Sequence, residues 1–141
     1  MPLSDAITAS ATALDAQRAR IEVAVSNIAN AESTRGPDGQ PYRRRDVVLR
    51  AEPVEPFSHS LGRAEAIGVT VNEIVEDQSP FRRRYEPAHP DADAQGFVAM
   101  PNVDVPEEMV DMLGAARAYQ ANLTAINLIR DTIQKALELG R

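Results

Sequence analysis

The side chains best suited to binding a metal ion gather in one short acidic segment. Asp91, Asp93 and Gln95 have the alternate spacing of the oxygen ligands that open a calcium-binding loop. Gly96 follows, as that loop requires, but the twelfth position is Asn102 instead of a bidentate glutamate. We therefore interpret the segment as a turn held by aspartate side chains, with a calcium site as the alternative.

Two runs of three arginines are the candidates for contact with nucleic acid. They occupy residues 43–45 and 82–84. Both runs are expected in β-strands, where side chains alternate between the two faces and nearby acids can pair with them. The net charge of −6 also opposes phosphate binding. Structural ion pairs are therefore favoured, and no nucleic-acid partner is predicted.

The remaining reactive residue types form no catalytic pattern. His59 and His89 each lack a second ligand at helical spacing, so we assign no metal to either. The sequence has no cysteine, which excludes a disulfide framework and any thiolate metal site. It also has no phosphate-binding glycine loop and no nucleophile motif. We predict a protein that is not an enzyme and uses no cofactor.

Helices at the two ends of the chain must position whatever lies between them. Residues 3–36 and 107–141 contain no proline, whereas eight of the ten prolines fall within 35–104. At both ends apolar residues recur at steps of three and four, which keeps one side of a helix facing a partner. This pattern predicts an α+β protein in which long terminal helices form a coiled-coil-like pair around a small β-rich, loop-rich middle segment. The predicted assembly seam consists of Ile7, Leu14, Ile21, Val25, Ile28, Met109, Met112, Tyr119, Leu123, Ile126, Ile133 and Leu137.

Arginine interrupts the apolar rhythm once in each helix. Arg18 and Arg130 stand at positions where the pattern calls for an apolar residue. We favour an aliphatic stem that packs while the charged head reaches water. The alternative is a device that sets the register between helices.

Capping residues predict where the two helices begin and end. The first is expected to start at a cap on Ser4 and to end near Asn30. For the second helix, Asp104 with Glu107 three residues later forms a capping box. That helix is expected to stop at Gly140.

The middle of the chain is expected to form short strands. Residues 51–66 carry proline and glutamate with few β-branched side chains, so they are predicted to be a loop. The predicted strands are 42–50, 68–76, 81–86 and 97–100. The predicted parts of the chain are an N-terminal helix at 1–34, the β-rich middle segment at 35–104 and a C-terminal helix at 105–141.

The start of the chain does not resemble a secretory signal. Its first residues, MPLSDAIT, contain no basic region and no unbroken apolar run. The longest uncharged stretch, 118–129, is too short and too polar to span a bilayer. These rules predict a cytosolic protein without membrane insertion.

A motif at the end of the first helix resembles the bacterial flagellar rod and hook protein family. It is Asn27-Ile-Ala-Asn30, followed by Thr34. Where the wider family often continues Thr-Pro-Gly-Tyr, this chain has Thr-Arg-Gly-Pro. The proximal-rod members of the family also often lack that proline-glycine turn.

Further blocks extend this resemblance over nearly the whole chain. The sequence MPNVDVPEEMVDM at 100–112, with ARAYQAN at 116–122, is similar to the C-terminal region of the proximal-rod members. SPF at 79–81 and HPDAD at 89–93 match the middle of the same proteins. The family motif positions in this chain are Asn27, Ala29, Asn30, Met100, Pro101 and Asn102.

The resemblance implies a structural role. Termini of the family form a coiled-coil pair that packs with copies of itself and with other rod proteins into a helical tube. That rod crosses the periplasm within the flagellar basal body and transmits torque from motor to hook. Its subunits leave the cytoplasm through the flagellar type III export apparatus without a cleaved signal, so the resemblance replaces the cytosolic prediction. The alternative function is a small calcium- or nucleic-acid-binding module with an accessory helix pair.

The two asparagines of the first motif lie three residues apart and share a helix face. One hypothesis is that both amides bond backbone groups near Pro101 and Asn102, fixing how the last helix meets the first. The other is local: Asn30 only helps to terminate its own helix.

Overall fold

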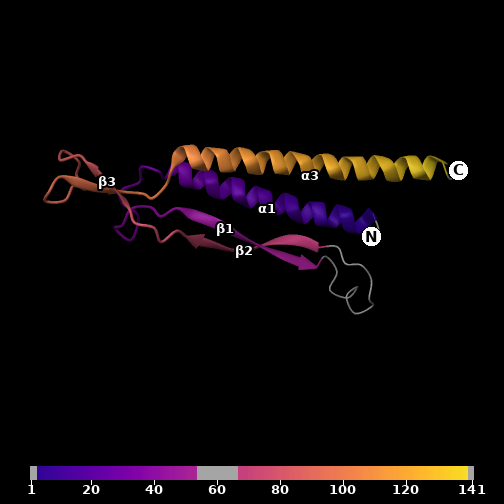
Figure 1. Ribbon diagram of the computed structural model, residues 1–141, viewed down its shortest axis with the longest axis horizontal. Helices are drawn as coiled ribbons and strands as arrows, with labels where there is room; N and C mark the ends of the chain where they lie inside the picture. The colour runs from indigo at the N-terminus through magenta and orange to yellow at the C-terminus, as the bar shows by residue number, and fades with distance from the viewer. Residues whose placement is uncertain (1–2, 54–66, 140–141) are drawn as a thin grey trace. The chain divides into compact units, whose positions relative to one another are not determined.

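The chain has an α+β fold with a long helix at each end and short antiparallel strands between them (Figure 1). The computed structural model describes residues 3–53 and 67–139. The predicted fold class is confirmed. The elements follow one another in the order α1 (Leu3–Ala29), β1 (Arg45–Pro53), β2 (Ile67–Glu76), β3 (Arg82–Tyr85), β4 (Phe97–Met100) and α3 (Val105–Leu139).

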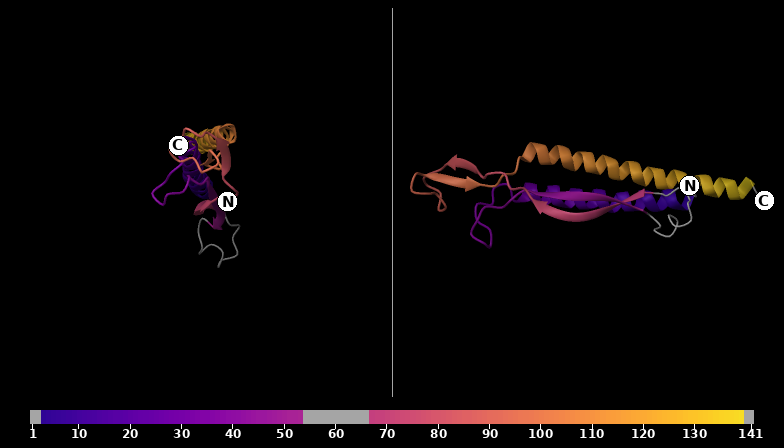
Figure 2. Two further views of the ribbon diagram at one scale, coloured as in Figure 1. Left: turned by 90° about the vertical axis from the view of Figure 1, so that its left-hand side faces the viewer. Right: turned by 60° about the horizontal axis from the view of Figure 1, so that its bottom comes forward.

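The described residues divide into two compact units, and α1, β1, β2 and α3 each run through both. In each unit a stretch of α1 packs beside a stretch of α3 (Figures 1 and 2). The first unit holds residues 3–19, 48–53, 67–73 and 114–139, and the second holds residues 20–47 and 74–113.

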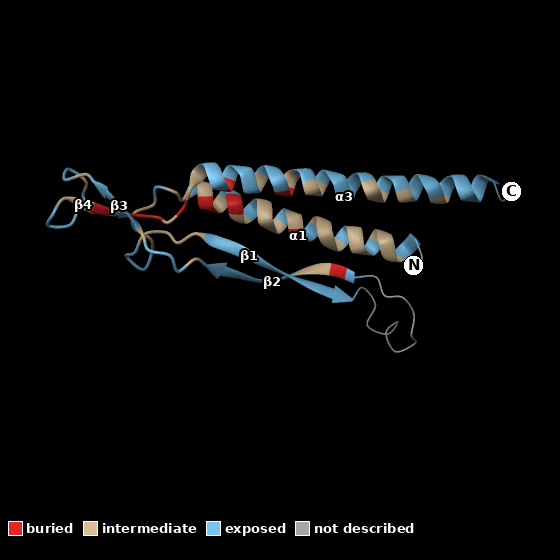
Figure 3. Ribbon diagram, viewed as in Figure 1, coloured by how far each residue is buried: buried red, intermediate tan, exposed pale blue. Residues whose placement is uncertain are grey.

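Small side chains line the helix contact of the first unit. Ala16 on α1 and Ala115 on α3 are buried there, whereas most of α3 in this unit is exposed (Figure 3). The backbone N–H of Val69 in β2 donates to the hydroxyl of Thr12 in α1 at 3.1 Å. Because alanine buries little apolar surface, this unit has a thin core.

The second unit has the larger side chains of the core. Val98 and Met100 of β4 are buried, as is Val103 in the segment that leads into α3. β3 pairs antiparallel with β4, so that Tyr85 lies opposite Phe97. Those two rings meet edge to face with centroids 5.2 Å apart.

The Asp104 side of the capping box predicted for the last helix is confirmed, and the cap predicted for the first helix is wrong. The Asp104 side chain accepts the N–H of Glu107 at 3.4 Å, and α3 begins at the next residue after Asp104. Ser4 lies inside α1, where its hydroxyl donates to the Asp5 carboxylate at 3.2 Å. The predicted stop at Gly140 lies outside the described residues.

The strands agree with the sequence patterns at β4 and differ most at β1. Residues 97–100 form a strand as predicted, and β2 and β3 differ from prediction by a residue at one or both ends. β1 spans residues 45–53 instead of 42–50, and side chains from elsewhere accept the N–H groups of Arg44 and Arg45 where it begins. Residues 51–53 of the predicted loop therefore belong to a strand, and the rest of that loop lies outside the described residues.

Gly96 closes the turn between β3 and β4 in a backbone conformation that favours glycine. Its φ is +82°, and a Cβ there would lie 2.9 Å from the Tyr85 ring and 3.2 Å from Pro87. Gly39 has nearly the same φ, +77°, but nothing lies within 4 Å of its Cβ position.

We expect Gly96→Ala to lower the free energy of unfolding by about 2–3 kcal/mol, since it adds steric overlap to left-handed strain. Gly39→Ala is the matched control, and its strain alone should cost about 1 kcal/mol. Urea denaturation of both variants measures the difference. Equal losses would show that the contact with Tyr85 and Pro87 relaxes without cost.

Candidate functional site

A buried polar contact joins the end of α1 to the start of α3 in the second unit. Asn27 and Glu108 are 1% and 2% exposed, and among the described residues they are the buried polar side chains. The Asn27 amide Nδ2 donates to Glu108 Oε2 at 2.9 Å. We call this contact, with the groups bonded to it, the polar junction.

The Asn27 amide uses its whole hydrogen-bonding capacity. Nδ2 also donates to the carbonyl of Arg45 at 2.8 Å, while Oδ1 accepts the Arg45 N–H at 3.0 Å. The Tyr42 hydroxyl donates to the same Oδ1 at 2.9 Å. With the bond to Glu108, this makes two donated and two accepted bonds, which is all that an amide can form. Asn27 therefore joins both helices to the segment that enters β1.

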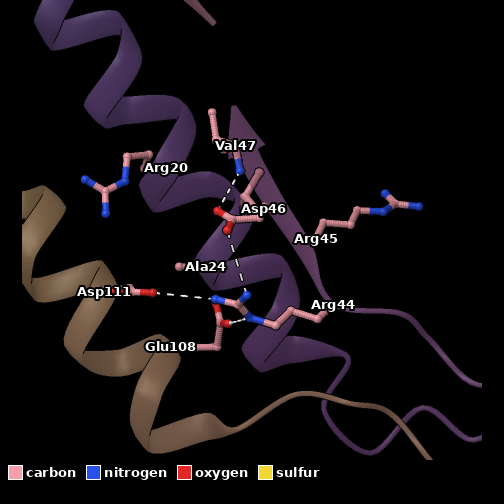
Figure 4. A pocket seen from close by; sticks show the side chains of 9 residues that line it. Arg20, Ala24, Arg44, Arg45, Asp46, Val47, Glu108 and Asp111 are labelled. Atoms are coloured by element: carbon pink, nitrogen blue, oxygen red, sulfur yellow. Dashed lines mark hydrogen bonds and ion pairs between the residues drawn. The ribbon is translucent and has the colours of Figure 1, made fainter. Parts of the chain in front are cut away.

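The Arg44 guanidinium completes the junction beside the Glu108 carboxylate. Its Nε donates to Glu108 Oε1, and Nη2 lies 3.6 Å from Asp111 (Figure 4). A longer contact of 3.8 Å joins Nη1 to Asp46. The hydrogen bond and charge of Glu108 raise the pKa of Arg44 above its usual value. The buried carboxylate is thus both hydrogen-bonded and neutralised, as burial of a charge requires.

A second asparagine holds the neighbouring amide of the same segment. Asn102 Oδ1 accepts the N–H of Arg44 at 2.8 Å, next to the Arg45 N–H that Asn27 accepts. The Asn102 Nδ2 donates to the carbonyl of Asp77 at 3.1 Å and to the Ser79 hydroxyl at 2.9 Å. Pro101 beside it is fully buried. Two motifs far apart in sequence therefore hold successive backbone amides.

Only one of the two asparagines in the first motif reaches the junction. Asn30 Nδ2 donates back to the Ser26 carbonyl at 2.9 Å, and its Oδ1 accepts the Ser33 hydroxyl at 3.2 Å. The hypothesis that both amides bond backbone near Pro101 and Asn102 is therefore wrong. The local hypothesis describes Asn30, because α1 ends at Ala29 and Asn30 lies in the following turn. Ala29 is exposed.

Sequence reasoning missed the partners of Asn27. The signal at Glu108 was available: it stands between Val105 and Met112 at steps of three and four, as an acid in an otherwise apolar row. For Tyr42 and Arg44 there was no such signal, since nothing local distinguishes them from their neighbours.

The predicted assembly seam divides into half-buried and exposed residues. The exposed members show that each helix turns part of the seam to solvent in the single chain, and Arg18 and Arg130 are exposed beside them. The half-buried members are Ile7, Leu14, Ile21, Ile28, Met112, Tyr119, Ile126 and Ile133. The exposed members are Val25, Met109, Leu123 and Leu137.

Comparison with known proteins links this architecture to a family. Residues 7–37 match the family model described as "Flagella basal body rod protein", and residues 94–139 match "Flagellar basal body rod FlgEFG protein C-terminal". The chain is 44% identical to the flagellar basal-body rod protein FlgC of Salmonella typhimurium over the full length of both chains. It is also 44% identical to FlgC of Bacillus subtilis, covering 96% of each chain, and 43% identical to FlgC of Escherichia coli O157:H7 over the full length of both.

The chain belongs to the FlgC family of flagellar basal-body rod proteins. It is a structural subunit of the rod and not an enzyme, and the family assembles with other flagellar rod proteins. None of the helices that the structure describes has the length and apolar character needed to cross a membrane. Asn27 lies within the residues matched by the first family model, and Asn102 and Glu108 lie within those matched by the second.

The acidic segment considered for calcium is held by protein donors in this family member. Asp93 Oδ1 accepts the N–H groups of Gln95 and Phe97 at 2.8 and 2.9 Å, and these bonds, led by that of Phe97, lower the pKa of Asp93. Asp91 bonds the Thr34 hydroxyl at 2.8 Å and pairs with Arg35 at 2.6 Å. These contacts support the interpretation as a turn held by aspartate side chains.

The arginine runs likewise have partners within the chain. The first run is mostly outside a strand, contrary to prediction, since only its last residue lies in β1. Arg43 stacks over the Phe81 ring with its guanidinium carbon 4.3 Å from the centroid. The acidic partners of the other five are Glu108 for Arg44, Glu76 for Arg45, Asp104 for Arg82, Asp93 for Arg83 and Glu86 for Arg84.

We expect Asn27→Ala to lower the free energy of unfolding by about 2 kcal/mol or more, because it leaves Arg45 backbone groups and the Glu108 carboxylate with fewer partners. Asn30→Ala is the matched control one helical turn away, and it should cost less than about 1 kcal/mol because its bonds are local. Chemical denaturation of the two variants tests this. Comparable losses of stability in the two variants would mean that the bonds of Asn27 contribute no more to folding than the local bonds of Asn30.

Proposed function

We propose that this chain polymerises with other axial proteins, and with copies of itself, into the helical proximal rod that transmits torque from motor to hook. The observation that carries the proposal is the exposed apolar surface of α3. In the second unit, Met109, Val110 and Leu113 are 48%, 69% and 53% exposed. In the first unit, Leu123, Leu128 and Leu137 are exposed in the same way.

An apolar surface of this kind fits a subunit better than a free monomer. Exposed apolar patches on soluble proteins mark contact sites, and the fully buried apolar side chains of the two helices, among the described residues, are alanines. Neighbouring subunits would cover α3 and supply the missing apolar burial. A head-to-tail contact repeated by a fixed rotation that does not close produces a helical tube.

The family supports the remaining parts of the proposal. As a member of the FlgC family, the chain would occupy the periplasmic rod of the basal body. It would reach that place through the flagellar type III export apparatus without a cleaved signal. Residues 1–34 and 105–141 would form the rod core, with residues 35–104 as the middle segment. The seam residues and the motif positions would make contacts within and between subunits.

We expect Leu123→Asp to block rod assembly and swimming while the isolated protein keeps its stability. Leu123 is 44% exposed in the single chain, so a carboxylate there stays hydrated until a neighbouring subunit covers it. Motility assays and electron microscopy of basal bodies measure assembly, and denaturation of the purified variant measures stability. Leu123→Met keeps the apolar surface and should preserve swimming. Normal rods in the Leu123→Asp strain would show that this part of α3 does not belong to the assembly surface.

We also expect the two units to differ in stability before assembly. In the isolated monomer, amides of 3–19 and 114–139 should exchange with solvent rapidly, because their helix contact buries mainly alanine. Amides of 20–29 and 105–113 should exchange at least about tenfold more slowly, since the polar junction holds them. Hydrogen exchange monitored by mass spectrometry tests which of the two units exchanges faster. Equal protection of both units in a verified monomer would contradict the expectation.

A further inference from the structure

The buried Glu108 stands on the opposite side of α3 from an exposed apolar face. Each residue turns an α-helix by about 100°, so Met109, Leu113 and Val110 lie about 100°, 140° and 200° around the axis from Glu108. These three apolar side chains are exposed, whereas Met112, only about 40° from Glu108, is half-buried. The apolar face thus points outward on the side of α3 opposite the buried Glu108 carboxylate.

In the second unit, the apolar side chains of this one turn do not by themselves select its rotation about the helix axis. In the turn that follows Glu108, the apolar side chains of Met112, Met109, Leu113 and Val110 cover an arc about 160° wide around the axis, and Asp111 lies outside it. The fully buried apolar residue that α1 contributes in this unit is Ala24, whose side chain is small, whereas Ile21, Val23 and Ile28 are only half-buried. Within this arc, more than one rotation of the turn would bury similar apolar area.

We propose that the polar junction fixes the rotation of α3 about its axis and thereby keeps Met109, Val110 and Leu113 turned outward for a neighbouring rod subunit. The identity of the neighbour rests on the proposed function, whereas the fixed rotation of α3 rests on the polar junction alone. Only one rotation brings the Glu108 carboxylate to Asn27 Nδ2 and Arg44 Nε together. In any other, a buried carboxylate or a buried amide would lose its partners.

Arg44 and Glu108 are positioning residues in this proposal, and their contribution is specificity. A buried ion pair is expensive to desolvate, and well-packed apolar replacements are often as stable or more stable. Replacing both partners by apolar residues should therefore leave stability unchanged or raised. It should also make the Glu108 side of α3 apolar, so that this side no longer selects the rotation.

The absence of cysteine from the sequence makes the rotation measurable in the full-length protein. Val110→Cys places a thiol on the outward face, and Met112→Cys places one on the inward side. The two single-cysteine proteins are labelled with a small maleimide, and the ratio of their rates reports the rotation. Each reporter is then combined with Arg44→Met/Glu108→Leu. The matched control is Arg84→Met/Glu86→Leu, which removes an ion pair at the end of β3 whose side chains are 47% and 39% exposed.

In the parent protein we expect the Val110→Cys thiol to react at least about tenfold faster than the Met112→Cys thiol. In Arg44→Met/Glu108→Leu the ratio should fall below about threefold, while the urea midpoint stays unchanged or rises. The control should keep the parent ratio. A ratio that survives in Arg44→Met/Glu108→Leu would overturn the proposal, because packing would then set the rotation. Loss of cooperative unfolding would overturn it too, since the pair would then supply stability.

A separate variant distinguishes this inference from the proposed function. Val110→Asp changes the outward face and leaves the polar junction intact, so it should abolish rods in cells while the isolated protein keeps the parent midpoint. Normal rods with Val110→Asp would show that no neighbouring subunit needs this face, and that part of the proposal would be overturned. The labelling ratio in the isolated protein would still decide whether the junction sets the rotation.

Discussion

The structure of the second unit depends on one side-chain amide. Asn27 donates to Glu108 on α3 and to the Arg45 carbonyl, and it accepts from the Arg45 N–H and the Tyr42 hydroxyl. Because all four of its hydrogen-bonding positions are used, this side chain cannot move without breaking contacts to two other parts of the chain. The end of α1, the start of α3 and the entry to β1 are therefore held at one point.

This arrangement suits a protein whose helices are made for contacts with neighbours. The buried helix residues are mainly alanine, and larger apolar side chains such as Val110 and Leu113 face solvent. A polar junction can specify how helices meet without using those apolar side chains, which remain available to other subunits of a FlgC-type rod. The described residues have little core for their number, and under the proposed function neighbouring subunits would supply further burial.

Local patterns predicted the regular elements well and the junction poorly. Asp104 was identified as a cap and β4 was placed at its observed residues, since both depend on neighbours in sequence. The predicted strand at 42–50 begins three residues before β1. The entry to β1 is bonded by Asn27 and Asn102, which come from distant parts of the chain. The two asparagines of the first motif looked equivalent in sequence, yet one is buried at the junction and the other ends a helix.

The sequence by itself determined the fold class, the capped start of the last helix and, through its motifs, the membership of the flagellar rod family. Those properties follow from periodicity, turn residues and short motifs, which are encoded locally. Only the tertiary structure decided which polar residues are buried, which partners they have and which side of α3 faces outward. The physical reason is that a buried carboxylate such as Glu108 is tolerated only where distant groups neutralise and bond it, and that match exists only after folding.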